Sequence, residues 1–141
     1  MKGKIMVTTM RKGRKSLAAI GLSLLMAGGV LASASPASAA WTDCPSGRSC
    51  LWVGNNYPGL PNGIFVSDIV LSSSNNQINS IVNNGTTWRS RFFDSSNFTG
   101  INISLNNPAR GGQTRDPLLS NGTDATPVNW ANKISSAEFY S

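Results

Sequence analysis

The stretch LWVGNNYPG, residues 51–59, places two aromatic residues and a glycine at the spacing aromatic-x4-aromatic-x-Gly. These three residues are Trp52, Tyr57 and Gly59. A strand that leaves a sheet and folds back as a hairpin can pack the two rings against each other at the fold. Glycine then supplies a backbone conformation with positive φ, which a residue with a Cβ atom resists. The spacing therefore predicts a folded hairpin corner in an all-β protein.

The same spacing occurs a second time in RFFDSSNFTG, residues 91–100, where the three positions are Phe93, Phe98 and Gly100. Each corner stands in the same local order: a strand, the corner, a second strand, a polar turn that ends in serine, and a last strand. Four antiparallel strands with a long return connection form a Greek-key unit. The repeat therefore predicts two Greek-key units that follow each other in the chain.

Short alternating stretches fill the sequence after the first forty residues, and no run keeps a helical period of 3.6 residues. Six of them are predicted as strands: 49–54, 63–67, 78–82, 88–93, 101–105 and 134–140. Between them lie turns that are rich in Gly, Asn, Ser and Pro. The sequence predicts an all-β double Greek-key sandwich, with units over about residues 49–83 and 88–141.

The first 40 residues have the three-part pattern of a secretory signal peptide. Basic residues stand first, an apolar segment runs from Leu17 to Leu31, and Ala37-Ser38-Ala39 offers a cleavage site. The apolar segment is short and interrupted by glycine, whereas a membrane-spanning helix needs about 20 apolar residues. We expect residues 1–40 to be removed, which leaves residues 41–141 as one secreted, extracellular domain without a membrane segment.

Removal of the signal changes the charge of the protein. The whole chain has 12 Lys and Arg residues against 6 Asp and Glu residues, a net charge of +6. Six of the basic residues lie within the first 15 positions, so the mature part has six basic and six acidic residues and no net charge. A nucleic-acid partner requires a basic surface. We therefore expect no nucleic-acid partner.

The two cysteines, Cys44 and Cys50, lie in CPSGRSC at residues 44–50. In an exported protein a close pair of cysteines predicts a disulfide, and the alternatives are two free thiols or half of a metal site. The sequence contains no histidine and no further cysteine, which leaves too few ligands for a zinc site. A disulfide here would tie the start of the domain to its first strand.

These residues resemble the βγ-crystallin superfamily, and the resemblance covers Cys44 to the C-terminal end. The export signal, the CPSGRSC segment and the WxxxxYxG unit are similar to those of the secreted actinobacterial proteins of peptidase inhibitor family I36. The resemblance implies a βγ-crystallin-like fold and inhibition of an extracellular protease, in particular a metalloprotease. Separately, we expect a monomer that requires no cofactor.

The candidate inhibitory segment is NNPARGGQTRDPLLSNGTDATPVN, residues 106–129. It contains the 15 residues by which the second unit exceeds the first between the corner glycine and the final serine turn. A loop of this length is often functional, and we expect it to occlude the active cleft of the protease. The side chains that could enter a protease pocket are Arg110, Arg115, Leu118 and Leu119. The alternative is a flexible solvated insertion, which the adjacent Gly111 and Gly112 favour.

The polar turns NNQINS (75–80) and ANKISS (131–136) are similar to the calcium-binding turn of βγ-crystallins, Asn/Asp-Asn/Asp-x-x-Ser/Thr-Ser. The candidate calcium ligands are Asn75, Asn76, Gln77 and Asn79. Asn79 stands where the pattern has Ser or Thr, and Ala131 replaces the first Asn or Asp of the second turn. Both turns lack a carboxylate, so calcium would bind weakly. Alternatively the turns are structural, with Asn and Ser side chains bonded to nearby backbone.

Catalysis is the least supported function. Without histidine the chain has no Ser-His or Cys-His nucleophile pair, and we expect no enzyme. Two alternatives to inhibition remain: a structural or weakly calcium-binding secreted protein, and a secreted antagonist with a toxin-like role. Among the tryptophans we expect Trp88 and Trp130 to lie in the core and Trp41 to be exposed.

Overall fold

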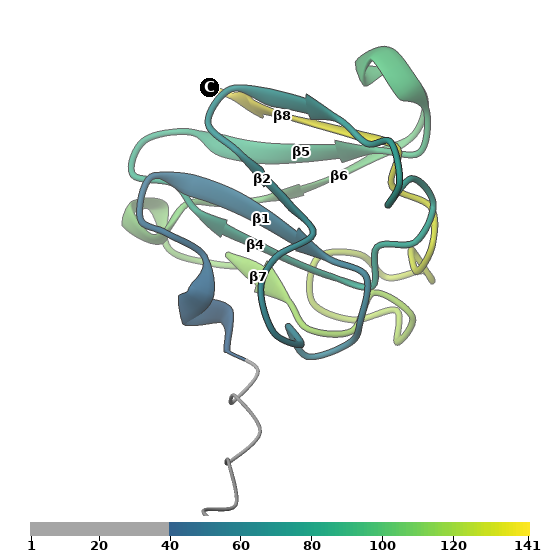
Figure 1. Ribbon diagram of the computed structural model, residues 1–141. Coiled ribbons are helices and arrows are strands. Elements are labelled where there is room, and N and C mark those ends of the chain that lie inside the picture. The colour runs from purple at the N-terminus through teal and green to yellow at the C-terminus, as the bar shows by residue number, and fades with distance from the viewer. Residues whose placement is uncertain (1–39) are drawn as a thin grey trace, which may run out of the picture. The chain divides into compact units, whose positions relative to one another are not determined.

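Eight short β-strands form two four-stranded antiparallel sheets in the computed structural model, which describes residues 40–141 (Figure 1). The signal peptide predicted over residues 1–40 lies, except for Ala40, outside the described residues. The described part contains no helix that is long and apolar enough to span a membrane. Both sheets, the core and the disulfide lie wholly within it, so residues 40–141 can be tested as a folded unit.

The first sheet has the strand order β2-β1-β4-β7, and all neighbouring strands are antiparallel. Its strands are β1 (Arg48–Trp52), β2 (Gly63–Phe65), β4 (Ser80–Asn84) and β7 (Arg115–Asp116). Strand β1 lies next to β4 along its whole length, with Cys50 opposite Val82. The predicted disulfide is confirmed: Cys44 and Cys50 are bonded with their Cα atoms 5.8 Å apart.

The second sheet has the order β3-β8-β5-β6 and is also antiparallel. Its strands are β3 (Asp68–Val70), β5 (Arg89–Phe93), β6 (Asn102–Leu105) and β8 (Ser136–Tyr140). Three single turns of 3-10 helix complete the described elements: η1 (Trp41–Asp43), η2 (Ser96–Phe98) and η3 (Pro108–Arg110). The two sheets therefore form the layers of an all-β sandwich, as the sequence predicted.

The two halves of the chain exchange one strand each. Strand β3 belongs to the first half but pairs with β8 in the second sheet. Strand β7 belongs to the second half but pairs with β4 in the first sheet. Neither β3 nor β7 was predicted, because three and two residues are too few to show an alternating pattern. The other six strands overlap the six predicted stretches.

The core fills the space between the sheets. Alternation along β1 and β4 turns Leu51 and Ile81 towards this core, while Cys50 and Val82 face the other side of the first sheet. There they pack with the disulfide partner and the first corner in a second, smaller cluster: Cys44, Cys50, Trp52, Tyr57 and Val82. The first sheet is thus covered on both faces, and the first corner rests on the outer one.

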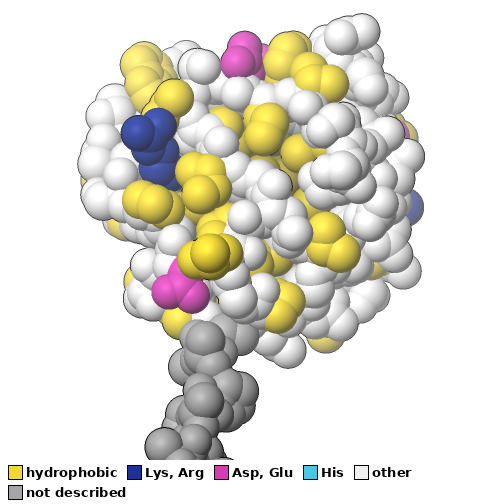
Figure 2. Space-filling model, in the orientation of Figure 1, with side chains coloured by type: hydrophobic (Ala, Val, Ile, Leu, Met, Phe, Trp, Pro, Cys, Tyr) yellow, Lys and Arg dark blue, Asp and Glu magenta, His cyan; other side chains and the backbone are white. Residues whose placement is uncertain are grey.

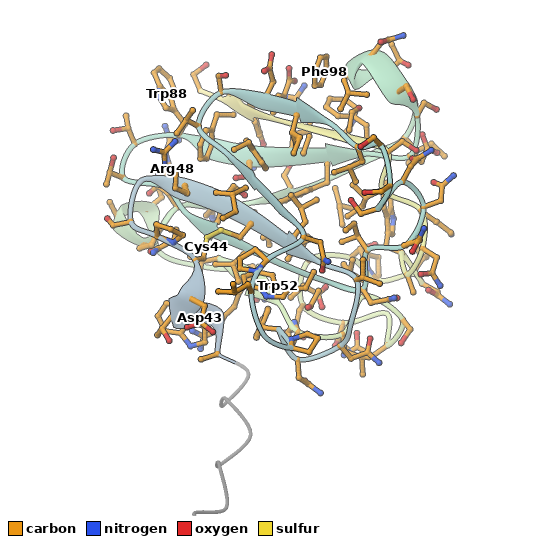
Figure 3. The ribbon with its side chains drawn as sticks, viewed as in Figure 1. Asp43, Cys44, Arg48, Trp52, Trp88 and Phe98 are labelled. Atoms are coloured by element: carbon orange, nitrogen blue, oxygen red, sulfur yellow. A yellow bond between two sulfur atoms is a disulfide. The ribbon has the colours of Figure 1, made fainter. Side chains whose placement is uncertain are left out.

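The tryptophan predictions have mixed outcomes. Trp130 is 3% exposed and belongs to the core, as expected. The prediction that Trp88 is a core residue is wrong, because its side chain is 48% exposed. Trp88 precedes β5 and lies in the connection from β4, so its side chain is outside the space between the sheets. Figure 3 shows Trp88 at the rim of the molecule, away from Cys44 and Trp52.

Candidate functional site

The first corner has two rings, a glycine and a serine in contact. The rings of Trp52 and Tyr57 meet edge to face with their centroids 5.2 Å apart, and Trp52 Nε1 donates to the carbonyl of Gly59 at 3.0 Å. Gly59 has a φ of 64°, but Tyr57 also has a positive φ, of 58°. For a residue with a Cβ atom this conformation costs about 1–2 kcal/mol. The Tyr57 N–H donates to Ser80 Oγ at 3.2 Å, which helps to hold it.

The second corner repeats this geometry. The rings of Phe93 and Phe98 meet edge to face with centroids 6.3 Å apart, and Gly100 has a φ of 85°. Phe98, like Tyr57, has a positive φ, of 60°, and its N–H donates to Ser136 Oγ at 3.0 Å. The final serine of each polar turn therefore fastens the corner of its own half to the sheet.

The segment 106–129, predicted as one long loop, is divided by a strand. Strand β7, Arg115–Asp116, pairs with β4 at the edge of the first sheet. The division leaves a first loop (residues 106–114) and a second loop (residues 117–129). Each loop has its own buried anchor residues, so the segment does not behave as a solvated insertion.

A buried carboxylate holds the second loop. Asp116 is fully buried and accepts hydrogen bonds from the N–H of Leu118 at 2.9 Å and of Ala125 at 3.2 Å. Burial raises the pKa of the Asp116 carboxyl, because desolvation disfavours its charged form, while the two backbone donors act in the opposite direction. Asp116, at the end of β7, thus holds both ends of the eight-residue bend formed by residues 118–125.

The first loop is closed by hydrogen bonds at its base and inside its tip. The Asn106 N–H donates to the Gln113 carbonyl at 2.8 Å, and Asn106 Nδ2 donates to the Gly111 carbonyl at 3.0 Å. Asn107 is 1% exposed, and its Oδ1 accepts from the N–H of Arg110 at 2.9 Å, which caps η3. The two asparagines were not among the predicted site residues, although Asn before Pro at a helix start is a recognisable cap signal. The exposed tip therefore has a defined shape.

The four predicted inhibitory side chains do not form one surface. Arg110 is exposed on the first loop, and Leu118 is half-buried. Arg115 is exposed, but its guanidinium lies 4.6 Å from the centre of the Trp41 ring. The expectation that Leu119 faces a protease is wrong, because Leu119 is fully buried in the core. Its backbone bonds to Asn79 and Trp130 fix the residue there.

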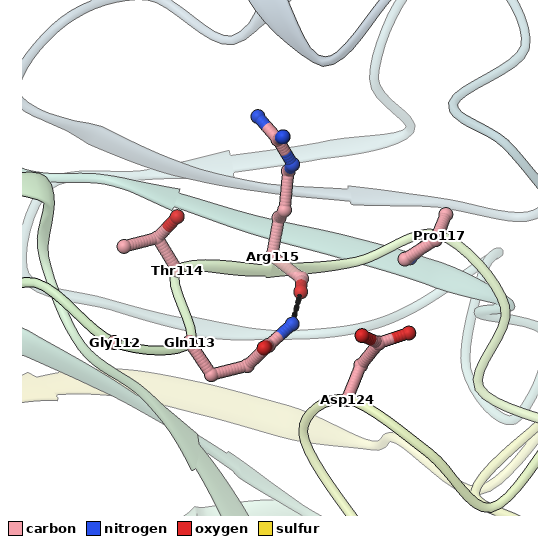
Figure 4. A pocket seen from close by; sticks show the side chains of 6 residues that line it. All are labelled: Gly112, Gln113, Thr114, Arg115, Pro117 and Asp124. Carbon is pink, nitrogen blue, oxygen red and sulfur yellow. Dashed lines mark hydrogen bonds between the residues drawn. The ribbon is translucent and has the colours of Figure 1, made fainter.

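A shallow cavity of about 350 Å³ lies between the two loops (Figure 4). It is lined by Gly112, Gln113, Thr114, Arg115, Pro117 and Asp124. In Figure 4 the guanidinium of Arg115 points away from the Asp124 carboxylate, while the Gln113 amide donates to the carbonyl of Arg115. The cavity therefore offers backbone and amide groups together with one carboxylate. Among residues 40–141, no group of three or more His, Cys, Asp or Glu side chains is placed to hold a metal ion.

The candidate calcium turns lie against each other. The Asn76 N–H donates to the Ile134 carbonyl at 3.0 Å, and the Asn132 N–H donates to the Ile78 carbonyl at 2.9 Å. Asn76 and Asn132 occupy the same position in their turns and both have positive φ, of 54° and 58°. The turns are thus related by an approximate twofold pattern, and each donates a backbone hydrogen bond to the other.

At the position of Asn79 the first turn does not fit a cation, although the side-chain oxygen of Asn75, another of the candidate ligands, is buried without a hydrogen-bond partner. The amide nitrogen of Asn79 lies where three acceptor oxygens converge: the Val53 carbonyl at 2.6 Å, the Gln77 carbonyl at 3.0 Å and Asn132 Oδ1 at 3.0 Å. The Asn76 side chain instead accepts from Ser135 Oγ at 3.1 Å. A calcium ion needs six to eight oxygen ligands, and here a hydrogen-bond donor faces the oxygens.

The surface carries few charges and several exposed apolar side chains. Figure 2 shows yellow hydrophobic and white uncharged groups over most of the visible face, with isolated charged groups between them. The large exposed apolar residues are Trp41, Leu60, Ile64, Val66, Val70, Trp88, Ile101 and Val128. They lie on several different strands and loops, so no single element presents all of them.

Two packed antiparallel sheets and a repeated aromatic corner define a βγ-crystallin fold, and a solved structure agrees. One described as "Evolution of the eye lens beta-gamma-crystallin domain fold" has a TM-score of 0.53 and 18% identity, over 69% of this chain and 89% of that chain. A βγ-crystallin domain from Flavobacterium johnsoniae has a TM-score of 0.48 and 18% identity, over 66% and 93% of the two chains. A βγ-crystallin from an archaeon has a TM-score of 0.49 and 18% identity, over 68% and 100%.

The sequence comparison finds a similarity to one family. The family model described as peptidase inhibitor family I36 matches residues 37–105. No curated protein matches the chain. The predicted resemblance to family I36 is thus confirmed over the disulfide, the first corner and the strands up to the end of β6. The match ends before the first loop.

Proposed function

We propose that the mature chain is an exported peptidase inhibitor that places its first loop, residues 106–114, in the active cleft of a secreted metalloprotease. The family match supports inhibition in general. The observation that supports this loop is its internal closure by Asn106 and Asn107, with Arg110 exposed near the tip. The disulfide between Cys44 and Cys50 agrees with an extracellular location.

The physical argument is pre-organisation. A flexible loop must be ordered when it binds, and each immobilised long side chain costs about 0.5–1.5 kcal/mol of entropy. The first loop has its ends joined and its tip capped before any partner arrives, so most of its backbone ordering has already occurred on folding. Inhibition then requires no chemistry by the inhibitor, because the loop excludes substrate from the cleft.

Arg110 is the side chain through which the loop would make its main contact. It is exposed and is the last residue of the short turn η3, and its backbone N–H donates to Asn107 Oδ1. An arginine can donate in a bidentate manner to a carboxylate or stack on an aromatic ring, and arginine is enriched among the residues that dominate binding energy.

The test is inhibition of a thermolysin-like metalloprotease by purified residues 40–141, with a subtilisin-like serine protease in parallel. We expect R110A to weaken the inhibition constant by about tenfold or more. The matched control is R48A, another exposed arginine that begins β1, and we expect it to change inhibition by less than about twofold. Deletion of residues 110–119 is unsuitable, because it would also remove the buried Asp116 and Leu119.

The outcomes separate mechanism from function. Equal inhibition by R110A, R48A and the unchanged chain would contradict occlusion by the first loop but not inhibition itself. No inhibition of either enzyme by a folded, uncleaved chain would contradict the proposed function. The chain must be checked for cleavage after the assay, because a competing substrate also slows the hydrolysis of a reporter.

A further inference from the structure

Asn79 differs from its twofold counterpart in the way it meets the opposite turn. The hydroxyl oxygen of the counterpart, Ser135, lies 3.1 Å from Asn76 Oδ1 and 3.0 Å from the Asp94 carbonyl, and its single hydrogen serves these two acceptors. Asn79 uses an amide nitrogen, which contacts one oxygen from its own turn, one from the opposite turn and one from the first corner hairpin. The two halves are therefore joined by different chemical groups at equivalent positions.

The nitrogen is the atom that must face the three oxygens. The carbonyls of Val53 and Gln77 are acceptors and cannot donate a hydrogen bond, so Asn79 Oδ1 in that position would be repelled by both. The amide group has two hydrogens and is therefore electropositive on this side. Three acceptors at 2.6–3.0 Å exceed these two hydrogens, and such a convergence of oxygens is typical of a site that favours positive charge.

We propose that the side-chain amide of Asn79 replaces a metal cation in the first turn and joins the two turns and the first corner without an ion. Serine at this position would be shorter and would bring one hydrogen to three acceptors, which would leave at least two oxygens facing each other. Asparagine supplies a second hydrogen and fills the space. The junction between the halves is thus independent of calcium at this turn.

The test compares N79S with the unchanged residues 40–141, both with and without calcium. Without calcium, N79S should melt about 5–10 °C lower, because carbonyls lose their donors. With about 10 mM calcium, which is above the dissociation constants of weak sites, N79S should regain most of this loss. Calorimetric titration should show that N79S binds one calcium ion more than the unchanged chain. N79A has neither a donor nor an oxygen in its side chain, so it should melt at a lower temperature than the unchanged chain both without and with calcium.

Ser135 provides the control for the other turn. In an S135A background, which removes the hydroxyl of the second turn, the N79S substitution should still add one bound calcium ion. Equal calcium stoichiometry in N79S and the unchanged chain, with no recovery of melting temperature, would overturn the proposal. So would calcium binding by the unchanged chain that N79A abolishes, because the Asn79 side chain would then act as a ligand.

A measurement on the unchanged chain keeps the proposal testable if N79S does not fold. The side-chain NH₂ signals of Asn79 can be assigned in an NMR spectrum by their absence from the spectrum of a folded N79Q or N79T variant. We expect these signals to exchange slowly with solvent and to keep their positions when calcium is added. Fast exchange, or a calcium-dependent shift of these signals in the S135A background, would contradict the proposal.

Discussion

Replacement of Leu119 by alanine tests whether the second loop is anchored in the core. Leu119 is fully buried among core side chains, whereas its neighbour Leu118 is half-buried on the same loop. Truncation of a fully buried leucine removes about 2–5 kcal/mol of stability through lost transfer energy and the cavity that remains. For a domain of this size each kcal/mol corresponds to about 4–8 °C. L119A should therefore melt about 8–40 °C lower.

The matched variant L118A has the same change in composition one residue away. Since Leu118 is only partly removed from water, L118A should lower stability by less than about 1 kcal/mol. Guanidinium denaturation of both variants, followed by tryptophan fluorescence and far-UV circular dichroism, gives the free energies and shows whether the slope with denaturant is unchanged. If L118A proves as destabilising as L119A, or if L119A unfolds like the unchanged chain, the assignment of Leu119 as the anchor is incorrect.

Two further predictions concern the corners and the buried carboxylate. Gly59 and Gly100 both have positive φ, but a Cβ atom at Gly59 would meet no neighbour within 4 Å, while one at Gly100 would overlap the Asp94 carboxylate. In chemical denaturation, G100A should therefore be at least about 1 kcal/mol less stable than G59A. Equal losses of stability in the two variants would argue against this packing. Because burial raises the pKa of Asp116, the Asp116 carboxyl binds a proton more readily in the folded chain than in the unfolded chain. The stability of the unchanged chain relative to D116N should therefore rise as the pH falls from 7 towards about 4. A stability difference that is constant with pH would contradict a raised pKa.

The corners were predictable because their signal is local. The spacing of Trp52, Tyr57 and Gly59 lies within eight residues, and its repeat in the second half identified the double Greek key. The left-handed backbone of Tyr57 was not predicted, because it depends on Ser80, which is far along the sequence and bonds the Tyr57 N–H. Local patterns thus identify the fold but not the bonds that hold its strained residues.

The segment 106–129 shows what sequence patterns do not reveal. Its length suggested one exposed loop, but β7 attaches the segment to the first sheet and Leu119 enters the core. Both features come from pairing with distant residues, which leaves no periodic signal in a two-residue strand. The prediction that Trp88 lies in the core was wrong for a related reason, since its position next to a strand did not determine whether its side chain faces the core.

The exchange of β3 and β7 also determines when the protein can fold. During synthesis the N-terminal end of a chain emerges from the ribosome first, so β8, residues 136–140, is the last strand to emerge. In the folded protein β8 lies between β3 and β5 rather than at a sheet edge. Until those five residues emerge, β3 has no partner strand, and the second sheet lacks one of its two central members. A nascent chain can therefore not complete one half and add the other later. Folding of the domain is expected to follow synthesis as a single late event, as contacts between distant segments require.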